Sequence, residues 1–376
     1  MRMLPPLRLT GAIILRDGEL RQRSVAIIRG RIAKGPLPAV DLSGYLILPG
    51  IVDMLAEIPP ASMDAAPAPR IKRLRALAAA CGITTLWAVA PWSWAQGLET
   101  HLQATALIDA IRAENGPIDM RPALRVEVGC TETGPALLNT LEALRPSLVY
   151  FQATHDALAE LRQNDPAAFA LSARDLGMTS VQLFQALQQV DRRAIPRHLC
   201  RIAEVLDAIG AIYGSLDDKG GDVRETYSML GASLAACPAS YSAAAAGHAM
   251  GSPVLLEPTA VPTASQILRE GICSAFVSRG QPEALARRVL RLAGPDLVDL
   301  PRCWAMLSSN PAEIMRLADR GTLDYGRRAD LVVIRRDTLQ IEATIAAGQL
   351  VFIRGEAMAR FRQARTALAD RPIAAE

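Results

Sequence analysis

The chain has 376 residues, of which half are apolar, with 41 basic and 38 acidic side chains. This length allows one large domain and a smaller one, and the net charge of +3 lacks the basic excess that nucleic-acid binding requires. No apolar run approaches the roughly 20 residues that span a bilayer. Arg16 and Asp17 interrupt the first apolar run too early for a signal peptide. The six cysteines are scattered without paired spacing, which predicts reduced thiols and a cytoplasmic protein.

Both ends of the chain predict short β-strands with tight turns. The first 48 residues contain "TGAIILRDGEL" and "SVAIIRGRIAKGP", whose turns are marked by Asp17-Gly18 and by Gly30. The segments "ADLVVIRRD" and "GQLVFIRGEAM" near the end have the same character. We expect the two ends to pair into one small β-sandwich domain.

Strands and helices alternate between these ends. The expected strands are 45–52, 83–90, 123–128, 147–151, 208–213, 253–257 and 272–278. Amphipathic helices are expected in "PRHLCRIAEVLDAIG" and "PEALARRVLRLAG". Such alternation over about 270 residues predicts an α/β fold, a (β/α)8 TIM-type barrel, because no glycine-rich phosphate loop supports a doubly wound sheet. The predicted division is 1–48 and 322–376 for the β domain, and 49–321 for the barrel.

Several segments resemble the amidohydrolase superfamily. "LPGIVD" enters the first expected barrel strand, Asn310-Pro311 begins a short helix, and "RADL" starts at Arg328. The stretch from "GSLDD" to "GASLAACP" is similar to the branch that contains the diphosphohydrolases of phosphonate metabolism. The likeness covers nearly the whole chain. It implies an amidohydrolase-like barrel and, in active members, metal-dependent hydrolysis.

The resemblance also implies a set of metal ligands. Family members carry a His-x-Asp or His-x-His pair after the first strand, where this chain has Leu55 and Glu57. Glu127 matches the bridging carboxylate of the fourth strand. The first histidine is therefore absent, while two carboxylates remain.

The other ligand positions also carry different residues. Phe151, or Gln152 within a one-residue slip, falls where the fifth strand would supply a histidine. Leu216 replaces the next histidine, and Arg279 replaces the metal-binding aspartate. Leucine and phenylalanine have no lone pair, and arginine brings a permanent cation, so these positions predict a lost metal site.

An alternative site remains open. Glu57, Glu127, Asp217 and Glu257 fall at expected carboxyl ends of strands, and their oxygens suit Mg²⁺ or Mn²⁺. The first three also allow metal-free acid–base chemistry. Against a metal, Arg125 and Arg279 are placed to form ion pairs with these acids, or to bind a substrate.

Two other groups near the expected strand ends are candidates. His155 follows the fifth strand and is the best-placed histidine, although a polar loop residue near a helix start is the more common role. Trp87, Trp92 and Trp94 follow the second strand, where they are expected to cover the barrel mouth or to fill a vacated metal cavity.

Two hypotheses follow. The first is a metal-free, catalytically degenerate relative without a cofactor, which acts as a binding or partner subunit. Its partners would be a phosphorylated small molecule and, as a homo- or hetero-oligomer, other copies or an active relative. The second is an active hydrolase of phosphorylated or cyclic-amide compounds that uses a carboxylate-held Mg²⁺ or Mn²⁺, or metal-free chemistry.

Overall fold

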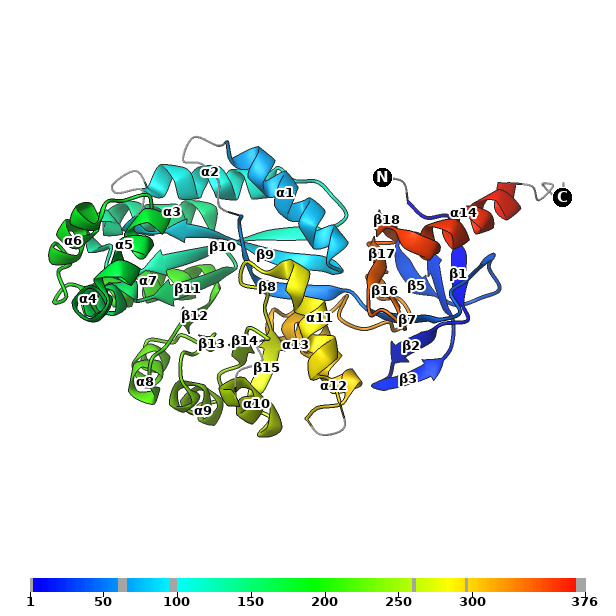
Figure 1. Cartoon of the computed structure of the whole chain (residues 1–376). Helices are drawn as coiled ribbons and strands as arrows, with labels where there is room; N and C mark the ends of the chain where they lie inside the picture. Colours follow the sequence, from blue (N-terminus) through cyan, green and yellow to red (C-terminus); the bar gives the residue numbers. More distant parts are fainter. Residues whose placement is uncertain (1–2, 60–65, 95–99, 259–261, 295–296, 370–376) are drawn as a thin grey trace.

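The computed structural model describes residues 3–59, 66–94, 100–258, 262–294 and 297–369. They form a barrel and, at one end of it, a smaller β domain that contains both ends of the described chain (Figure 1). No helix in these ranges combines the length and the apolarity that a bilayer crossing requires.

Eight parallel strands form the barrel sheet, in the spatial order β15-β14-β13-β12-β11-β10-β9-β8. Their bounds are β8 Ile51–Glu57, β9 Ile83–Trp92, β10 Asp119–Glu127, β11 Leu148–Gln152, β12 Ile212–Leu216, β13 Leu234–Ala236, β14 Val254–Leu256 and β15 Cys273–Phe276. The predicted (β/α)8 barrel is therefore confirmed.

The two edge strands of this sheet, β8 and β15, approach each other and nearly close the barrel. The N–H of Arg279, just after β15, donates to the carbonyl of Leu55 in β8 at 3.0 Å. The segment after helix α12 (Leu300–Ala305) bridges the same gap, because Val52 N–H donates to Leu307 O and Phe276 N–H donates to Met306 O.

Helices follow the strands and cover the barrel. They are α1 Pro67–Ala80, α2 Thr100–Arg112, α3 Gly134–Leu144, α7 Ile195–Ile209, α8 Gly221–Met229, α9 Tyr241–Ala249, α10 Pro262–Arg269, α11 Pro282–Leu292 and α13 Ser309–Ile314. Helix α7 shows why the sequence folds this way: Leu199, Ile202 and Leu206 are buried on one face. The helix ends at Gly210, whose φ of 71° is the left-handed conformation that glycine adopts without strain.

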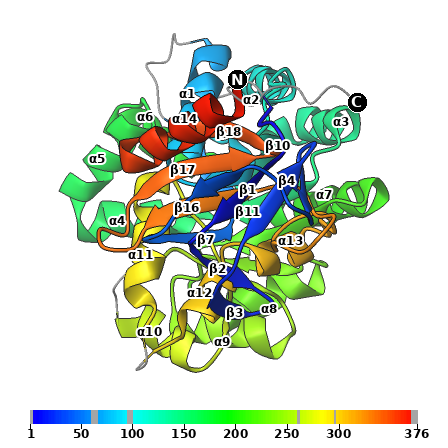
Figure 2. The same ribbon diagram turned by 90° about the vertical axis from the view of Figure 1, so that its right-hand side faces the viewer.

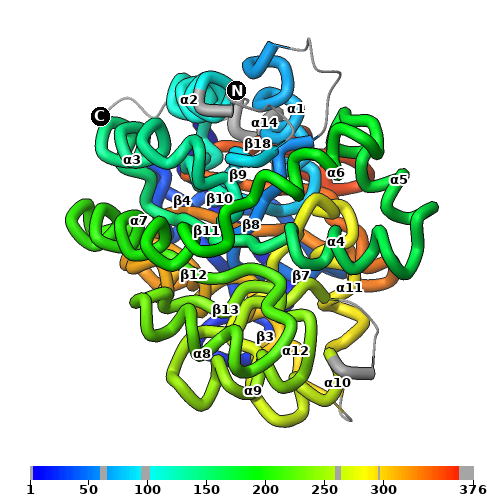
Figure 3. Tube along the Cα trace, turned by 90° about the vertical axis from the view of Figure 1, so that its left-hand side faces the viewer, coloured from blue at the N-terminus to red at the C-terminus, as the bar shows by residue number. Residues whose placement is uncertain are grey.

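Between β11 and α7 the chain inserts three helices, α4 Thr154–Asn164, α5 Pro166–Asp175 and α6 Ser180–Gln188. They lie on the side of the barrel where the strands end (Figure 1; Figure 3 looks onto this side). Phe169, Ala173 and Leu183 form a separate small core inside the insertion, and Trp94 packs against it.

The β domain contains two sheets, which fit the predicted β-sandwich (Figure 2). One has the order β5-β4-β1-β6 and the other β18-β17-β16-β7-β2-β3. Their bounds are β1 Leu7–Thr10, β2 Ile13–Arg16, β3 Glu19–Gln22, β4 Val25–Ile28, β5 Arg31–Ala33, β6 Ala39–Asp41, β7 Tyr45–Pro49, β16 Leu331–Arg335, β17 Ile341–Ala346 and β18 Gln349–Ile353. Helix α14 (Gly355–Ala369) packs beside β17 and β6.

Two expected strands are wrong in part, and one strand was not expected at all. The segment 45–52 is two strands, because β7 pairs with β16 in the β domain and β8 starts only at Ile51. The segment 208–213 begins inside α7, and its strand is β12, Ile212–Leu216. Strand β13 was missed, because its three residues, Leu-Ala-Ala, carry no β-branched or aromatic signal.

Candidate functional site

The carboxyl ends of the barrel strands form the mouth where barrel enzymes place their chemistry, and an ion pair crosses it. Arg279, after β15, donates from Nη1 to Asp217 Oδ1 and from Nη2 to Asp217 Oδ2, both at 2.6 Å. Gln152 Nε2, at the end of β11, also donates to Asp217 Oδ2 at 2.8 Å. Burial lowers the pKa of Arg279, but the hydrogen bonds and charge of Asp217 outweigh it and raise that pKa.

A second ion pair lies in the same mouth. Arg125 Nη1, on β10, donates to Glu57 Oε1, on β8, at 2.6 Å. The negative charge of Glu57 also stabilises the positive charge of Arg279. Further along, Arg288 of α11 lies 3.4 Å from Glu257, which follows β14. Both candidate substrate-binding arginines are therefore occupied by candidate catalytic carboxylates.

The backbone at these strand ends is unusual. Asp217, Cys237 and Arg279 have φ values of 64°, 47° and 41°, in the left-handed region that non-glycine residues rarely adopt. They follow β12, β13 and β15, so three strand ends of one mouth share this conformation. Such strain persists only where the surrounding contacts hold it, and it is concentrated at functional sites.

Apolar side chains close the barrel interior beneath the ion pairs. Leu55 and Leu216 are buried in one cluster together with Met54, Ala236 and Val277. The pairing of β8 with β9 shifts its register between Asp53 and Ala56. At this irregularity two consecutive residues, Met54 and Leu55, both belong to the interior cluster, whereas a regular strand would place only one of them there. The expected positions of two lost ligands are thus part of the hydrophobic core.

Phe151 does not lie in the mouth, and its assignment to a lost ligand position is corrected here. Its ring stacks on Tyr227 of α8 with centroids 6.0 Å apart and meets Tyr213 edge-on at 5.8 Å, between the sheet and the helices. Side chains alternate along a strand, so the next residue, Gln152, points into the mouth, where it bonds Asp217. Gln152 ends β11, however, which is the fourth strand of the barrel sheet, whereas the histidine position is expected at the fifth strand, β12. The expected strand number is therefore wrong by one.

Glu127 is engaged by the start of the helical insertion. Its Oε2 accepts from Thr154 N–H at 2.9 Å and from the Thr154 hydroxyl, at the first turn of α4. His155 Nδ1 lies 3.4 Å from Oε1, and its ring stacks on Trp94 with centroids 6.4 Å apart. A carboxylate stabilises the positive end of a helix, so Glu127 holds α4 onto the barrel.

The three tryptophans do not gather at one place. Trp87 is buried in the interior and donates to Ser147 Oγ at 3.0 Å, while Trp92 lies in the outer core and donates to Thr133 Oγ1 at 2.9 Å. Trp94 alone packs under the helical insertion. The expected cover over the mouth is therefore limited to one indole.

Sequence reasoning missed Asp53, which is fully buried in β8. Its Oδ1 accepts from the N–H groups of Ser278 (3.1 Å) and Leu55 (3.2 Å), and Oδ2 has no hydrogen-bond partner among the described residues. Burial raises the pKa of Asp53, although hydrogen bonds from Ser278 and Leu55 oppose the shift. The carboxyl ties β8 to the end of β15.

Asp218 was also missed as a structural residue. It accepts from Ser215 Oγ at 2.5 Å, and Arg224 of α8, which is fully buried, lies 3.8 Å from it. Burial raises the pKa of Asp218, with the Ser215 hydrogen bond and the Arg224 charge opposing. This network fixes the Asp217 turn from below.

The residues of the mouth do not fit the divalent ion that the superfamily implies. Leu55 and Leu216 offer no donor atom, Arg279 carries a positive charge, and Glu127 is engaged by α4. Within the described part of the chain, no three His, Cys, Asp or Glu side chains are grouped to hold a metal. No catalytic step through such an ion follows from this geometry.

Nucleophilic chemistry has little support in the mouth either. Cys237 is the thiol beside Asp217 and Arg279, and burial raises its pKa to about 12, with Arg279 opposing the shift. A thiol in that state is a poor nucleophile at neutral pH. Cys237 is therefore not poised to act as the nucleophile of this mouth.

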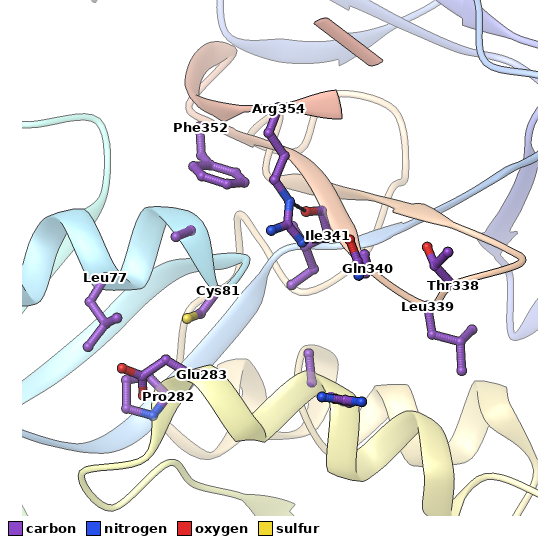
Figure 4. Close-up of a pocket in the computed structure, with 13 residues that line it drawn as sticks. Leu77, Cys81, Pro282, Glu283, Thr338, Leu339, Gln340, Ile341, Phe352 and Arg354 are labelled. Carbon is purple, nitrogen blue, oxygen red and sulfur yellow. Dashed lines mark hydrogen bonds between the residues drawn. The ribbon is translucent and has the colours of Figure 1, made fainter. Parts of the chain in front are cut away.

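A separate cavity of about 340 Å³ lies at the opposite end of the barrel, against the β domain (Figure 4). Cys81 and Leu77 at the end of α1, Glu283 at the start of α11 and Arg354 after β18 line it. Arg354 Nε donates to the carbonyl of Ile341 at 2.8 Å. In barrel enzymes the residues at this end contribute to stability rather than to catalysis. Burial raises the pKa of the Cys81 thiol to about 12.

Comparison with known proteins agrees with this architecture. Residues 275–356 match the model of the amidohydrolase family. A diphosphatase of Escherichia coli (strain K12) is 24% identical over 388 residues, which cover 91% of this chain and 96% of that protein. Together with the barrel and β-sandwich, these matches support an amidohydrolase-superfamily protein. Within the superfamily it resembles that relative, the alpha-D-ribose 1-methylphosphonate 5-triphosphate diphosphatase.

Solved structures show the same fold at low sequence identity. A variant of the N-acetyl-D-glucosamine-6-phosphate deacetylase of Mycobacterium smegmatis, bound to N-acetyl-D-glucosamine-6-phosphate, has a TM-score of 0.64 and 17% identity, covering 92% of this chain and 99% of that one. The dihydropyrimidinase of Brevibacillus agri has a TM-score of 0.53 and 14% identity, covering 93% and 95%.

Proposed function

We propose that this protein is a catalytically degenerate amidohydrolase relative that works as a binding or partner subunit without a metal. The observation that carries the proposal is the Arg279–Asp217 pair, in which a guanidinium stands where the family has a metal-binding aspartate. A cation so placed opposes a divalent ion by charge and already satisfies the nearby carboxylate.

The proposed ligand is a phosphorylated small molecule. The side chains of Arg125 and Arg279 are each 26% exposed, so solvent reaches part of each side chain at the mouth. A guanidinium pairs with phosphate in the same bidentate geometry as with a carboxylate, so a phosphoryl group can take over donors from Asp217 or Glu57. The name of the E. coli relative describes a phosphorylated ribose derivative, which is consistent with this class.

A first test measures metal and turnover. Protein is purified under conditions replete in Zn²⁺, Mn²⁺ and Mg²⁺, and its metal content is measured by inductively coupled plasma mass spectrometry. We expect far less than one ion per chain. We also expect no hydrolysis of alpha-D-ribose 1-methylphosphonate 5-triphosphate or of dihydrouracil. One bound ion per chain together with turnover would establish the active-hydrolase hypothesis instead.

A second test measures ligand binding. Calorimetric titration with ribose 5-phosphate is compared for the wild type, Arg279→Gln and Arg269→Gln, whose exposed side chain on α10 serves as the charge-matched control. We expect Arg279→Gln to weaken binding about tenfold, the effect of one charge-assisted hydrogen-bond pair. Equal binding by all three proteins would place the ligand elsewhere.

The partner role and the compartment belong to the same proposal. All six cysteines are free, which agrees with a reducing compartment such as the cytoplasm. Light scattering coupled to size exclusion, alone and with the E. coli-type diphosphatase, measures association with further copies or with an active relative. A monomer that binds neither ligand nor relative would contradict the proposal.

A further inference from the structure

The cavity of about 340 Å³ between the barrel and the β domain has the features of a ligand site (Figure 4). It is formed by the end of α1, the first half of α11, the turn between β16 and β17, and the end of β18. Small-molecule sites are typically clefts of at least about 300 Å³, and they occur preferentially where domains meet. No residue that lines this cavity belongs to the ion pairs of the mouth.

The floor of the cavity is apolar and comes from both domains. Cys81 and Ala286 are buried, and Leu77, Ile341 and Phe352 are partly buried against the main core. The floor therefore exists only where α1 meets α11, β17 and β18. Apolar surface that stays open to solvent gains free energy when an apolar group covers it.

A large apolar side chain at the edge of this floor is held in a costly backbone conformation. Leu339 has a φ of 54°, in the left-handed region that non-glycine residues rarely adopt, and 36% of the residue is exposed. Its N–H donates to the carbonyl of Arg335 at 2.8 Å, and Arg335 N–H donates to the carbonyl of Gln340 at 2.9 Å. The turn thus keeps an apolar residue at the rim of the cavity at the cost of strain.

Opposite charges without ion-pair partners stand around the floor. Glu283 on α11 and Arg354 after β18 are exposed, and neither forms an ion pair in the part of the chain that the structure describes. Burial is the main cause of the raised pKa of the Cys81 thiol, the charge of Glu283 adds to it, and the charge of Arg354 opposes it. Both charges therefore act on the same point of the floor. Arg287, one turn after Glu283, adds a second unpaired cation to the rim.

The Arg354 guanidinium is oriented by the β domain. Its Nε donates to the carbonyl of Ile341 at 2.8 Å, and its Nη2 lies 3.4 Å from Gln340 Oε1. The guanidinium also lies 5.9 Å from the centre of the Phe352 ring. Nη1 forms no hydrogen bond among the described residues, so the group keeps a donor for a carboxylate of a ligand.

We propose that this cavity binds a free α-amino acid with an apolar side chain. At neutral pH such a molecule carries an ammonium and a carboxylate on one carbon. Glu283 accepts from the ammonium, Arg354 and Arg287 donate to the carboxylate, and the apolar side chain covers the floor beside Leu77 and Phe352. A simple carboxylate would leave Glu283 facing a second negative charge, and a simple amine would leave both arginines unused.

Fluorine nuclear magnetic resonance tests the site directly. The protein has six phenylalanines, and in protein labelled with 4-fluorophenylalanine, Phe352→Leu assigns the signal of Phe352. The labelled protein is titrated at constant ionic strength with L-leucine, leucine amide, 4-methylpentanoate and glycine. We expect a saturable shift of the Phe352 signal with L-leucine. The other three lack the carboxylate, the ammonium and the apolar side chain, respectively, and should bind at least about tenfold more weakly.

Charge variants identify the partner of each ligand group. Glu283→Gln should weaken the binding of L-leucine about tenfold but should not weaken that of 4-methylpentanoate. Arg354→Gln should weaken the binding of L-leucine about tenfold and leave that of leucine amide unchanged. The controls Glu225→Gln and Arg269→Gln, at exposed positions away from the cavity, should bind L-leucine as the wild type does. A general loss of stability would weaken all ligands alike, so the crossed pattern is specific to charge pairing in this cavity.

Two outcomes overturn the inference. One is the absence of any saturable Phe352 shift at L-leucine concentrations in the tens of millimolar, which would leave the cavity as a gap in the packing of the two domains. The other is binding of leucine amide or 4-methylpentanoate as tightly as L-leucine, which would mean that the cavity does not recognise both charges. Neither outcome bears on metal content or on ligand binding in the mouth, so the proposed function is tested independently.

Discussion

Arg279 and Asp217 meet across the barrel mouth through two parallel hydrogen bonds of 2.6 Å, and both hold left-handed backbone conformations. Two residues that follow different strands, β15 and β12, are therefore fixed to each other. The pair links the end of β15, an edge strand of the barrel sheet that contacts β8, with the end of β12, which precedes α8. The salt bridge thus cross-links these two strands directly.

A double-mutant cycle on this pair should reveal a favourable coupling. Asp217→Asn keeps the left-handed turn, because asparagine tolerates positive φ, while Arg279→Gln removes the positive charge. We expect each single variant to lose about 1–2 kcal/mol of unfolding free energy and the coupling energy to be about 1 kcal/mol, because both side chains are only about a quarter to a third exposed. Urea denaturation of the four proteins measures it.

The control cycle uses Arg21 and Glu19, whose side chains are 60% and 50% exposed. Solvent screens that pair, so its coupling should be at most a few tenths of a kcal/mol. Equal coupling in the two cycles would mean that the mouth pair contributes no more than an ordinary surface contact. The interpretation of Arg279 as a built cross-link would then be wrong.

Much of the fold was predictable because hydrophobic patterns and turn residues repeat over the whole barrel. The exceptions are local. At Gly50 an ideal Cβ would lie 2.3 Å from Thr84 Oγ1, so only glycine lets the chain cross here from β7 in one domain to β8 in the other. The continuous apolar run hides that crossing, because both strands are buried and periodicity does not distinguish them.

The site was harder to predict than the fold, because register decides which face a side chain takes. Placing Phe151 instead of Gln152 in the mouth is an error of one residue, yet it moves the side chain to the other face of the sheet. The sequence predicts that Arg279 can form an ion pair with one of the nearby acids, but it does not identify Asp217 as the partner. Nothing local in the sequence showed that Glu127 would cap α4.

Glu127→Gln should loosen the helical insertion rather than the barrel. Glutamine keeps the size of the side chain but loses the charge and one acceptor oxygen facing Thr154 N–H and hydroxyl. The expected loss of about 1–2 kcal/mol corresponds to about tenfold faster amide hydrogen exchange in the first turns of α4. Hydrogen exchange by mass spectrometry measures it peptide by peptide.

The matched control for this exchange experiment is Asp165→Asn at the start of α5. Asp165 Oδ1 accepts from Ala168 N–H at 2.9 Å, and asparagine caps helices as well as aspartate. Exchange in α4 should stay as in the wild type. Unchanged exchange in Glu127→Gln would show that α4 is held by its apolar contacts alone.

Arg224→Met should destabilise the whole barrel. The Arg224 guanidinium is fully buried and donates to Ser215 Oγ at 2.6 Å, to Leu234 O at 2.7 Å and to Ala232 O. Methionine leaves the carbonyls of Leu234 and Ala232 without this donor and removes the positive charge that faces Asp218. Removing one member of a buried ionic network costs about 3–5 kcal/mol, measured by urea denaturation.

Glu225→Gln is the control for Arg224→Met, since its exposed side chain lies one position along α8. It should change stability by less than about 0.5 kcal/mol. A loss below about 1 kcal/mol in Arg224→Met would mean that helix packing, rather than the polar network, fixes α8 against β12 and β13.

Asp330, at the junction of the barrel and the β domain, should make stability depend on pH. Burial raises its pKa from 3.8 to about 6, and the charge of Arg328 only partly opposes this. Because the folded pKa is the higher one, the stabilising contribution is complete below pH 3.8 and is lost as pH rises to about 6. Relative to Asp330→Asn, which does not titrate, the wild type should lose up to about 3 kcal/mol across that window. Denaturation of both proteins from pH 4 to pH 7 measures the difference, and a constant or rising difference would show that the Asp330 pKa is not raised.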